Sequence, residues 1–503
     1  MMCNITGYSL AYGFLSSLDA LISQAFGAQY YKVMGLHAQR AVVIMSIATV
    51  PVGLLWTKTA SILHFGLGID MQTANLAGEW ATILSFGLWP TLMFEVLRKF
   101  LQGGQIVWPV VVATCISTAF NIIACFISIE VYSHGFHALA VISSLSQWVG
   151  LIALSVIIIL LKLYLRMGNS RRKEYEKVPI VEENFSLLES STIVHVDDSP
   201  IIVPLKSSVL INDSDSEDNW PPLSLDIFRG WYPFFELGLP GALSLLLEWG
   251  SFEMVAGIAG QLGSVSLAVH GVFMSTSSLF YLTSNAISLA TATIAGNYLG
   301  ENKPKEAKAA VFAGIYIDFI YGLLAGSVLL LFLRRTWGHI YSDDKAIDDL
   351  IYKTIPIMFV YLAIDSPKCI TLNVLRSTGR PLITVLGNII ACVVLMLPLG
   401  WFLAIRCSFG LVGLWGAMSG GWLVATILYL GTLIFTDWQA QADIAKQRNS
   451  LGMMATAEIH VQQEVSDGNL LIQDSIISVS QNNRNEDSVL ELEMKEFQIT
   501  VTS

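Results

Sequence analysis

Of the carboxylic acids inside long apolar stretches of this 503-residue chain, three have the clearest potential for chemistry. Glu248 and Glu253 are five residues apart in LLLEWGSFEMV, and Asp365 occurs in LAIDSPKCI. An ionised side chain at the centre of a membrane helix costs about 2.5–3.5 kcal/mol, so such residues usually serve a function. A carboxyl group removed from water binds its proton more tightly, and an arriving cation displaces that proton. These acids therefore have the chemistry to exchange protons for cations.

The spacing of the acids gives two expectations about their surroundings. Five residues on a helix correspond to about 140° around its axis, so Glu248 and Glu253 are expected to face differently. One is expected to line a cleft and the other to face a helical bundle. Lys368 follows Asp365 by one turn, and the alternative to a proton-accepting Asp365 is an Asp365–Lys368 ion pair that keeps the acid ionised.

Four further polar residues are candidates for substrate or ion contact. Asp19 and Gln24 lie in SSLDALISQ near one end of an apolar segment, where a polar network at a helix end is the alternative. Asn121 lies mid-segment in TAFNIIACF, and it either contacts substrate or hydrogen-bonds neighbouring helices. His270, in LAVHGVF, is either a proton relay or a buried neutral histidine.

Several kinds of chemistry have no support in the sequence. It contains no phosphate-binding GxxxxGK[ST] loop, no HExxH motif and no Ser-His-Asp set with usable spacing. Its six cysteines are scattered and form no CxxC pair, so neither a metal site nor a disulfide framework is indicated. We expect a protein that is not an enzyme and that needs no cofactor.

The composition is that of a membrane protein with many spans. Hydrophobic residues make up 54% of the chain and charged residues only 13%, against about 25% charged in soluble domains. A helix needs about 20 mostly apolar residues to cross a bilayer, and unbroken runs of this length exclude a barrel. The hydropathy predicts an all-α fold with eleven spans, near 5–27, 38–60, 77–97, 107–129, 137–163, 234–258, 265–290, 308–333, 351–374, 382–405 and 411–435.

Charge divides the chain into four parts. Basic residues concentrate in alternate short loops, which places those loops and the C-terminal tail in the cytoplasm and the N-terminus outside. The net charge of −11 comes from two acidic stretches, and no basic patch for nucleic acid is present. We predict an N-lobe at 1–165, a disordered cytoplasmic linker at 166–222, a C-lobe at 223–436 and a disordered tail at 437–503.

The two lobes resemble each other in sequence. SQAFGAQYYK at 23–32 is similar to GNYLGENKPK at 296–305, and FLQGGQ at 100–105 to VLRSTG at 374–379. HGFHALA at 134–140 is similar to FGLVGLW at 409–415. The offset stays between 273 and 275, and matching loops lie on the same face. This indicates a parallel repeat about an axis along the membrane normal, with a site between the halves. The first half lacks a partner for 234–258.

Six segments together resemble the multidrug and toxic compound extrusion (MATE) family, and most closely its eukaryotic branch. They are LSSLDALISQAFGAQ (15–29), FEVLRKFLQGGQIVWP (94–109), LPGALSLLLEWGSFE (239–253), ATATIAGNYLGENKPKEAK (290–308), VLRSTGRP (374–381) and GLVGLWGAMSG (410–420). The resemblance implies two six-helix lobes around a cleft that opens alternately to each face. It also implies export of organic, often cationic compounds in exchange for H⁺ or Na⁺. Relative to the family's twelve helices, the chain is expected to lack the first, which in some members carries an acid of the N-lobe ion site.

The resemblance also assigns roles to the candidate residues. It maps the family's paired glutamates onto Glu248 and Glu253 and an acidic position of its tenth helix onto Asp365. Asp19, Gln24 and Asn121 match family positions. We expect a monomer in the plasma membrane or a vacuolar-type membrane. Two alternatives are a flippase for lipid-linked substrates from the same superfamily and a truncated membrane protein that does not transport.

Overall fold

The computed structural model describes residues 2–66, 68, 70–131, 136–176 and 225–450, and this part of the chain contains helices and no strand. The α-helices are α1 (Leu10–Leu15), α2 (Ser17–Gly27), α3 (Tyr31–Thr57), α4 (Thr59–Ser61), α5 (Met71–Gly103), α6 (Trp108–Phe126), α7 (Phe136–Glu176), α8 (Tyr232–Gln261), α9 (Ser264–Gly300), α10 (Pro304–Val328), α11 (Lys345–Ser377), α12 (Pro381–Asn388), α13 (Leu397–Trp401) and α14 (Gly410–Ile434). Six π-helical turns extend or join them: η1 (Asn4–Ser9), η2 (Ile62–Gly66), η3 (Ile127–Val131), η5 (Leu329–Leu333), η7 (Ile389–Met396) and η8 (Phe402–Arg406). The 3₁₀ turns are η4 (Leu225–Phe228) and η6 (Gly338–Ile340).

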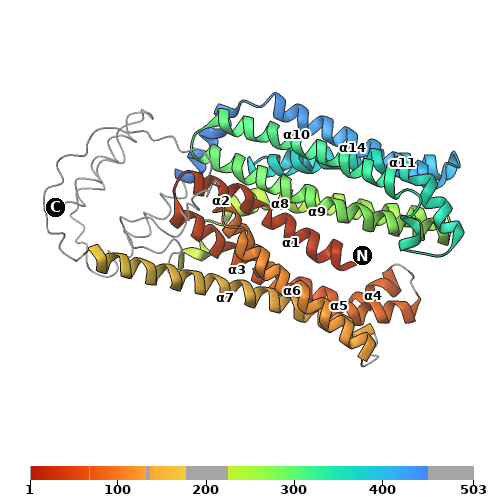
Figure 1. Ribbon diagram of the computed structural model, residues 1–503, viewed down its shortest axis with the longest axis horizontal. Coiled ribbons are helices and arrows are strands. Elements are labelled where there is room, and N and C mark those ends of the chain that lie inside the picture. Colours follow the sequence, from red (N-terminus) through yellow and green to blue (C-terminus); the bar gives the residue numbers. More distant parts are fainter. Residues whose placement is uncertain (1, 67, 69, 132–135, 177–224, 451–503) are drawn as a thin grey trace, which may run out of the picture. The chain divides into compact units, whose positions relative to one another are not determined.

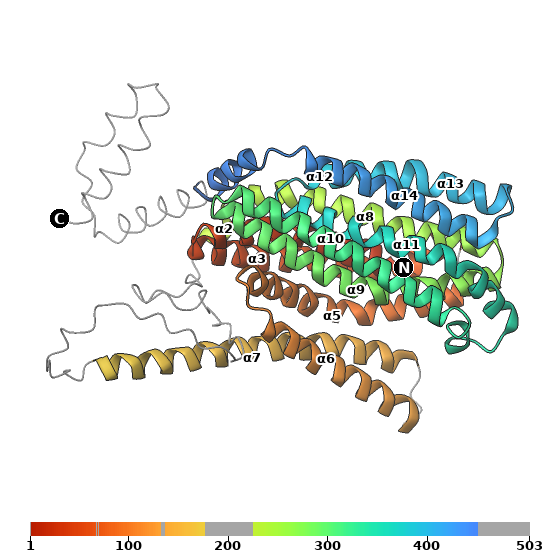
Figure 2. The same ribbon diagram turned by 45° about the horizontal axis from the view of Figure 1, so that its top comes forward.

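Ten helices in the described residues are long and apolar enough to cross a membrane, and they correspond to ten of the eleven expected spans. The first expected span, 5–27, is helical but divided into η1, α1 and α2, with a break at Ser16. The long helices run side by side along the horizontal axis of Figures 1 and 2. The protein is an integral, multi-pass membrane protein.

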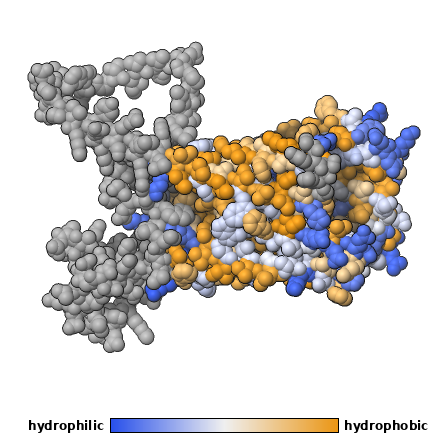
Figure 3. Space-filling view, turned by 90° about the horizontal axis from the view of Figure 1, so that it is seen from below, coloured by the Kyte–Doolittle hydropathy of each residue, from blue (hydrophilic) through white to orange (hydrophobic). Residues whose placement is uncertain are grey.

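Large apolar side chains cover much of the surface of these helices. In the span Trp108–Glu130, only 11% of the most apolar window is buried inside the protein, and Ile122, Ile123 and Phe126 are exposed. Figure 3 shows hydrophobic residues over the middle of one face and hydrophilic residues gathered at its right-hand end. Such a surface is stable against lipid tails, because every backbone group is bonded within its own helix.

The buried hydrophobic residues form two main clusters. One cluster draws on the first half of the chain, including Leu18, Met45 and Leu92, and the other on the second half, including Phe273, Tyr361 and Trp415. Contacts of α1 with α8 and of α2 with α9 connect the halves. Residues Met1–Gly452 form one compact unit, so the division into two lobes stays a prediction.

The helix boundaries repeat with the offset that the sequence indicates. Helices α3 and α10 begin 273 positions apart, and α5 and α11 begin 274 positions apart. The turns before them also match. Gln29, before α3, and Asn302, before α10, both have a positive φ. Each turn also contains the backbone hydrogen bond of a Schellman motif, which ends the preceding helix: Tyr30 N donates to Ala25 O, and Lys303 N donates to Tyr298 O. The internal repeat is therefore present in backbone geometry.

Helical structure extends into both segments that were expected to be disordered. Helix α7 continues to Glu176, eleven residues into the expected disordered linker. Residues 438–450 are helical, although the tail was expected to be disordered from 437. Trp438, Ala442 and Ala445 are buried, and their spacing puts them on one face of that helix. The helix forms because this face packs against the hydrophobic cluster of the second half, which includes Phe273, Tyr361 and Trp415. The rest of both segments, 177–222 and 451–503, lies outside the described residues.

Candidate functional site

A pocket with a volume of about 280 Å³ lies at the middle of α8, α9 and α11. It is lined by residues from these three helices and from η1: Asn4, Glu248, Trp249, Phe252, Glu253, Met274, Ser277, Ser278, Tyr281, Tyr361 and Asp365. Three acids and no Lys or Arg are among them. The pocket therefore brings together all three intramembrane acids singled out from the sequence.

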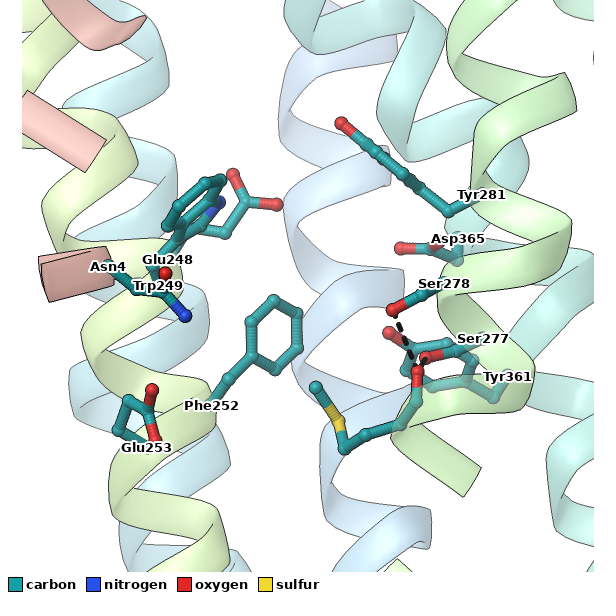
Figure 4. A pocket seen from close by; sticks show the side chains of 11 residues that line it. Asn4, Glu248, Trp249, Phe252, Glu253, Ser277, Ser278, Tyr281, Tyr361 and Asp365 are labelled. Carbon is teal, nitrogen blue, oxygen red and sulfur yellow. Dashed lines mark hydrogen bonds between the residues drawn. The ribbon is translucent and has the colours of Figure 1, made fainter. Parts of the chain in front are cut away.

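Glu248 and Glu253 both line this pocket, contrary to the expectation that one of them would face a helical bundle. The helical separation of about 140° is unchanged, but the pocket extends along α8 and reaches side chains on two flanks of that helix. Figure 4 shows the carboxylates of Glu248 and Asp365 directed into the space between α8 and α11. Glu248 is 7% exposed and Asp365 is also 7% exposed, so both are largely removed from water.

Lys368 lies behind the pocket wall and is paired chiefly with Glu248. Its Nζ donates a hydrogen bond to Oε1 of Glu248, whereas Oδ1 of Asp365 is 4.0 Å away. The same ammonium lies 4.0 Å from the ring centre of Trp422. The spacing within α11 offers an Asp365–Lys368 pair as an alternative, but it does not indicate the Glu248–Lys368 bond, because 120 residues separate those partners.

Aromatic rings supply most of the apolar lining. Trp249 and Phe252 come from α8, Tyr281 from α9 and Tyr361 from α11. Figure 4 shows the Phe252 ring projecting between α8 and the helices opposite. Trp249, Phe252 and Tyr281 thereby offer flat ring faces in the pocket, on which an organic cation can stack.

Asp19 is separate from the pocket and belongs to a polar cluster of the first half. Its Oδ1 accepts a hydrogen bond from Lys99 Nζ on α5. On the same helix, Arg98 Nε donates to Oε2 of Glu95 at 2.8 Å. The polar-network alternative therefore describes the geometry of Asp19.

Gln24 connects α2 to the second half of the chain. Its Nε2 donates to the carbonyl oxygen of Ser377 at 2.9 Å, and its Oε1 accepts a bond of 2.7 Å from Arg448 Nη1. Asn449 Nδ2 donates to the backbone oxygen of Gln24 at 3.1 Å. Burial lowers the pKa of Arg448 from its usual value. Gln24 therefore closes the predicted cytoplasmic side and does not line the pocket.

Asn121 and His270 also lie outside the pocket lining. Asn121 Nδ2 donates to Ser146 Oγ at 3.3 Å, which links α6 to α7. His270 is 2% exposed, its ring centre is 5.8 Å from that of Trp415, and neither ring nitrogen has a hydrogen-bond partner among the described residues. The geometry of both residues is that of helix packing.

Comparison with known proteins gives consistent results. The MatE family profile matches residues 1–127 and 240–402. Protein DETOXIFICATION 16 of Arabidopsis thaliana is 28% identical over 448 residues, covering 88% of this chain and 81% of that protein. Multidrug and toxin extrusion protein 2 of Oryctolagus cuniculus is 25% identical, covering 89% of this chain and 66% of that protein.

The fold is similar to solved structures of such proteins. The eukaryotic MATE transporter AtDTX14 superimposes with a TM-score of 0.73 at 24% identity, covering 89% of this chain and 88% of that structure. An outward-facing multidrug resistance MATE transporter superimposes with a TM-score of 0.66 at 17% identity, covering 88% and 86%. The matched profile spans more than half of the chain, and the helical repeat agrees with it. The chain belongs to the MATE family of membrane transporters, and it is of the eukaryotic type.

Proposed function

We propose that the protein is an antiporter that exports organic cations and other amphipathic foreign compounds in exchange for protons. The observation that carries this proposal is the pocket itself, in which three acids and four aromatic rings line one cavity inside the membrane. Relatives named for detoxification and for multidrug and toxin extrusion support the same substrate class.

The acids supply the means of exchange. A carboxylate in a water-poor pocket is stabilised either by a proton or by a bound cation, so the two compete for the site. Protons that arrive from the outside displace the substrate from Glu248, Glu253 and Asp365. Reorientation then exposes the acids to the cytoplasm, where they release their protons and bind the next cation. Each ligand favours the conformation that it binds more tightly, which couples the two movements, and the proton gradient sets their direction.

The flippase alternative requires cationic side chains for a pyrophosphate group. The residues that line this pocket include no Lys or Arg, and the nearby Lys368 is already bonded to Glu248. The lining therefore favours cationic over anionic substrates. The position of the acids halfway along three membrane helices also agrees with the midplane sites of secondary transporters.

A transport assay with separate gradients tests the proposal. Purified protein in vesicles is given a fluorescent organic cation, and the pH and sodium gradients are varied independently. We expect the uptake rate to increase with the pH gradient and to fall to background when a protonophore collapses that gradient. The sodium gradient should not change the rate. Uptake driven by sodium alone would contradict proton coupling, and an absence of transport under every gradient would favour the non-transporting alternative.

A further inference from the structure

Lys368 is a cation that the protein itself keeps beside its acidic pocket. The side chain is 2% exposed, and its ammonium bonds to Glu248 and lies 4.0 Å from both the Asp365 carboxylate and the centre of the Trp422 ring. A buried ammonium requires such partners, because removing it from water costs several kcal/mol. The ring and the two acids thus hold a charge of +1 directly behind the pocket wall.

The partners of this lysine divide the pocket acids into two kinds. Glu248 is bonded directly to Lys368, whereas Asp365 Oδ1 is 4.0 Å from the ammonium, beyond hydrogen-bond reach. Glu253, five residues after Glu248 on α8, lines the pocket from the same helix. We call these three acids and Lys368 the charge group. With the three acids ionised, the formal charge of this group is −2 in the presence of Lys368 and −3 in its absence.

We infer that Lys368 sets the charge selectivity of the transporter, so that the pocket favours organic cations with one positive charge over those with two. This inference rests on the proposed function and specifies its substrate class. The lysine repels any bound cation, and it repels a dication twice as strongly as a monocation. A unit charge at roughly 8 Å, in a medium of effective dielectric constant about 20, changes cation binding by roughly ten- to fiftyfold. Removing Lys368 therefore raises the affinity for a dication, relative to that for a monocation, by roughly ten- to fiftyfold.

Equilibrium binding to the full-length protein in lipid nanodiscs tests this inference. The probes are tetraethylammonium, a monocation, and methyl viologen, a flat dication, at a slightly alkaline pH that favours ionised acids. The measured quantity is the affinity for methyl viologen divided by that for tetraethylammonium. We expect Lys368→Gln to raise this ratio at least tenfold, whereas the matched control Lys368→Arg, which keeps the charge, leaves it within threefold of the wild-type value.

A second pair of variants tests the inference if Lys368→Gln alone does not fold. Glu248→Gln lowers the formal charge of the group to −1, and Glu248→Gln with Lys368→Gln restores −2 without leaving either partner buried and unpaired. We expect the ratio to fall in the single variant and to return to the wild-type value in the double variant. A ratio that is unchanged by loss of Lys368 in both backgrounds overturns the inference while wild-type binding still supports the proposed function. Wild-type protein that binds neither probe contradicts the proposed function, and the inference falls with it.

Discussion

The side-chain amide of Gln24, on α2, donates a hydrogen bond of 2.9 Å to the carbonyl oxygen of Ser377, at the end of α11. This bond joins the two halves of the chain across 353 residues, and Arg448 completes the junction by donating to the same glutamine. Under the proposed exchange mechanism the two halves separate on each side of the membrane in turn, so this junction would break when the predicted cytoplasmic side opens. Its strength therefore contributes to the balance between the two states.

We expect Gln24→Ala to shift that balance toward the state open to the cytoplasm. The Gln24 side chain makes one buried and one part-buried hydrogen bond, and at about 1 kcal/mol each they correspond to a roughly thirtyfold shift. The measurement is the rate at which a cysteine introduced at Ser377, in a chain without its native cysteines, reacts with a maleimide applied from the cytoplasmic side. Gln72→Ala, at an exposed position on α5, is the control and should leave the rate unchanged. Equal rates in both variants would contradict the role of the junction.

Close packing at the same junction predicts that Gly300→Ala destabilises the closed cytoplasmic side. A Cβ atom at Gly300 would lie 2.1 Å from the backbone oxygen of Gln24, which belongs to another helix and has little room to move. Such overpacking costs about 1–3 kcal/mol. Gly271→Ala on the same helix meets nothing within 4 Å and should be neutral or stabilising. Thermal unfolding in detergent distinguishes the variants, and equal midpoints would show that the helices separate without cost.

The Glu248–Lys368 pair predicts non-additive effects on stability. Glu248→Gln leaves the Lys368 ammonium buried without its bonded carboxylate, and breaking a buried pair in this way costs about 3–5 kcal/mol. Combining it with Lys368→Met removes the uncompensated charge and should restore most of the loss. Glu253→Gln, which leaves the pair intact, is the matched control. Thermal midpoints that fall equally in the single and double variants would contradict this account of the pair.

His270 is expected not to relay protons. It lies outside the pocket lining and packs against Trp415, so His270→Phe keeps the ring contact and removes every titrating nitrogen. Proton-driven uptake should stay within twofold of the wild-type rate. In the same assay, Asp365→Asn should lose its dependence on the pH gradient. Loss of proton coupling in His270→Phe would contradict this prediction and indicate that His270 relays protons.

The membrane helices could be predicted from the sequence because hydropathy is a local property. Among the described residues, ten long helices occur where apolar runs of about 20 residues occur, and segment 5–27 is helical with a break at Ser16. The repeat was also visible, since its turns need the same backbone geometry in both halves. The extent of helix 438–450 was missed because its apolar positions are few and are recognisable only by their helical spacing.

The site was predictable in its acids but not in their partners. Glu248, Glu253 and Asp365 stand out because charge is costly in an apolar run, and the structure places all three at one pocket. Which side chain bonds to which depends on how α8 packs relative to α11, and a sequence pattern within one helix carries no such information. For this reason the sequence offers Asp365, on the same helix, as the alternative partner of Lys368, whereas the hydrogen bond of Lys368 is to Glu248.

Proton-driven uptake of a fluorescent organic cation by the Glu248→Gln variant tests the central claim most directly. The claim is that the acids of this pocket exchange protons for substrate. We predict that wild-type vesicles accumulate the cation under a pH gradient and that Glu248→Gln reduces the initial rate at least tenfold. Glu79→Gln, at an exposed acid outside the pocket lining, should transport at the wild-type rate. Full proton-driven activity in Glu248→Gln would contradict the account.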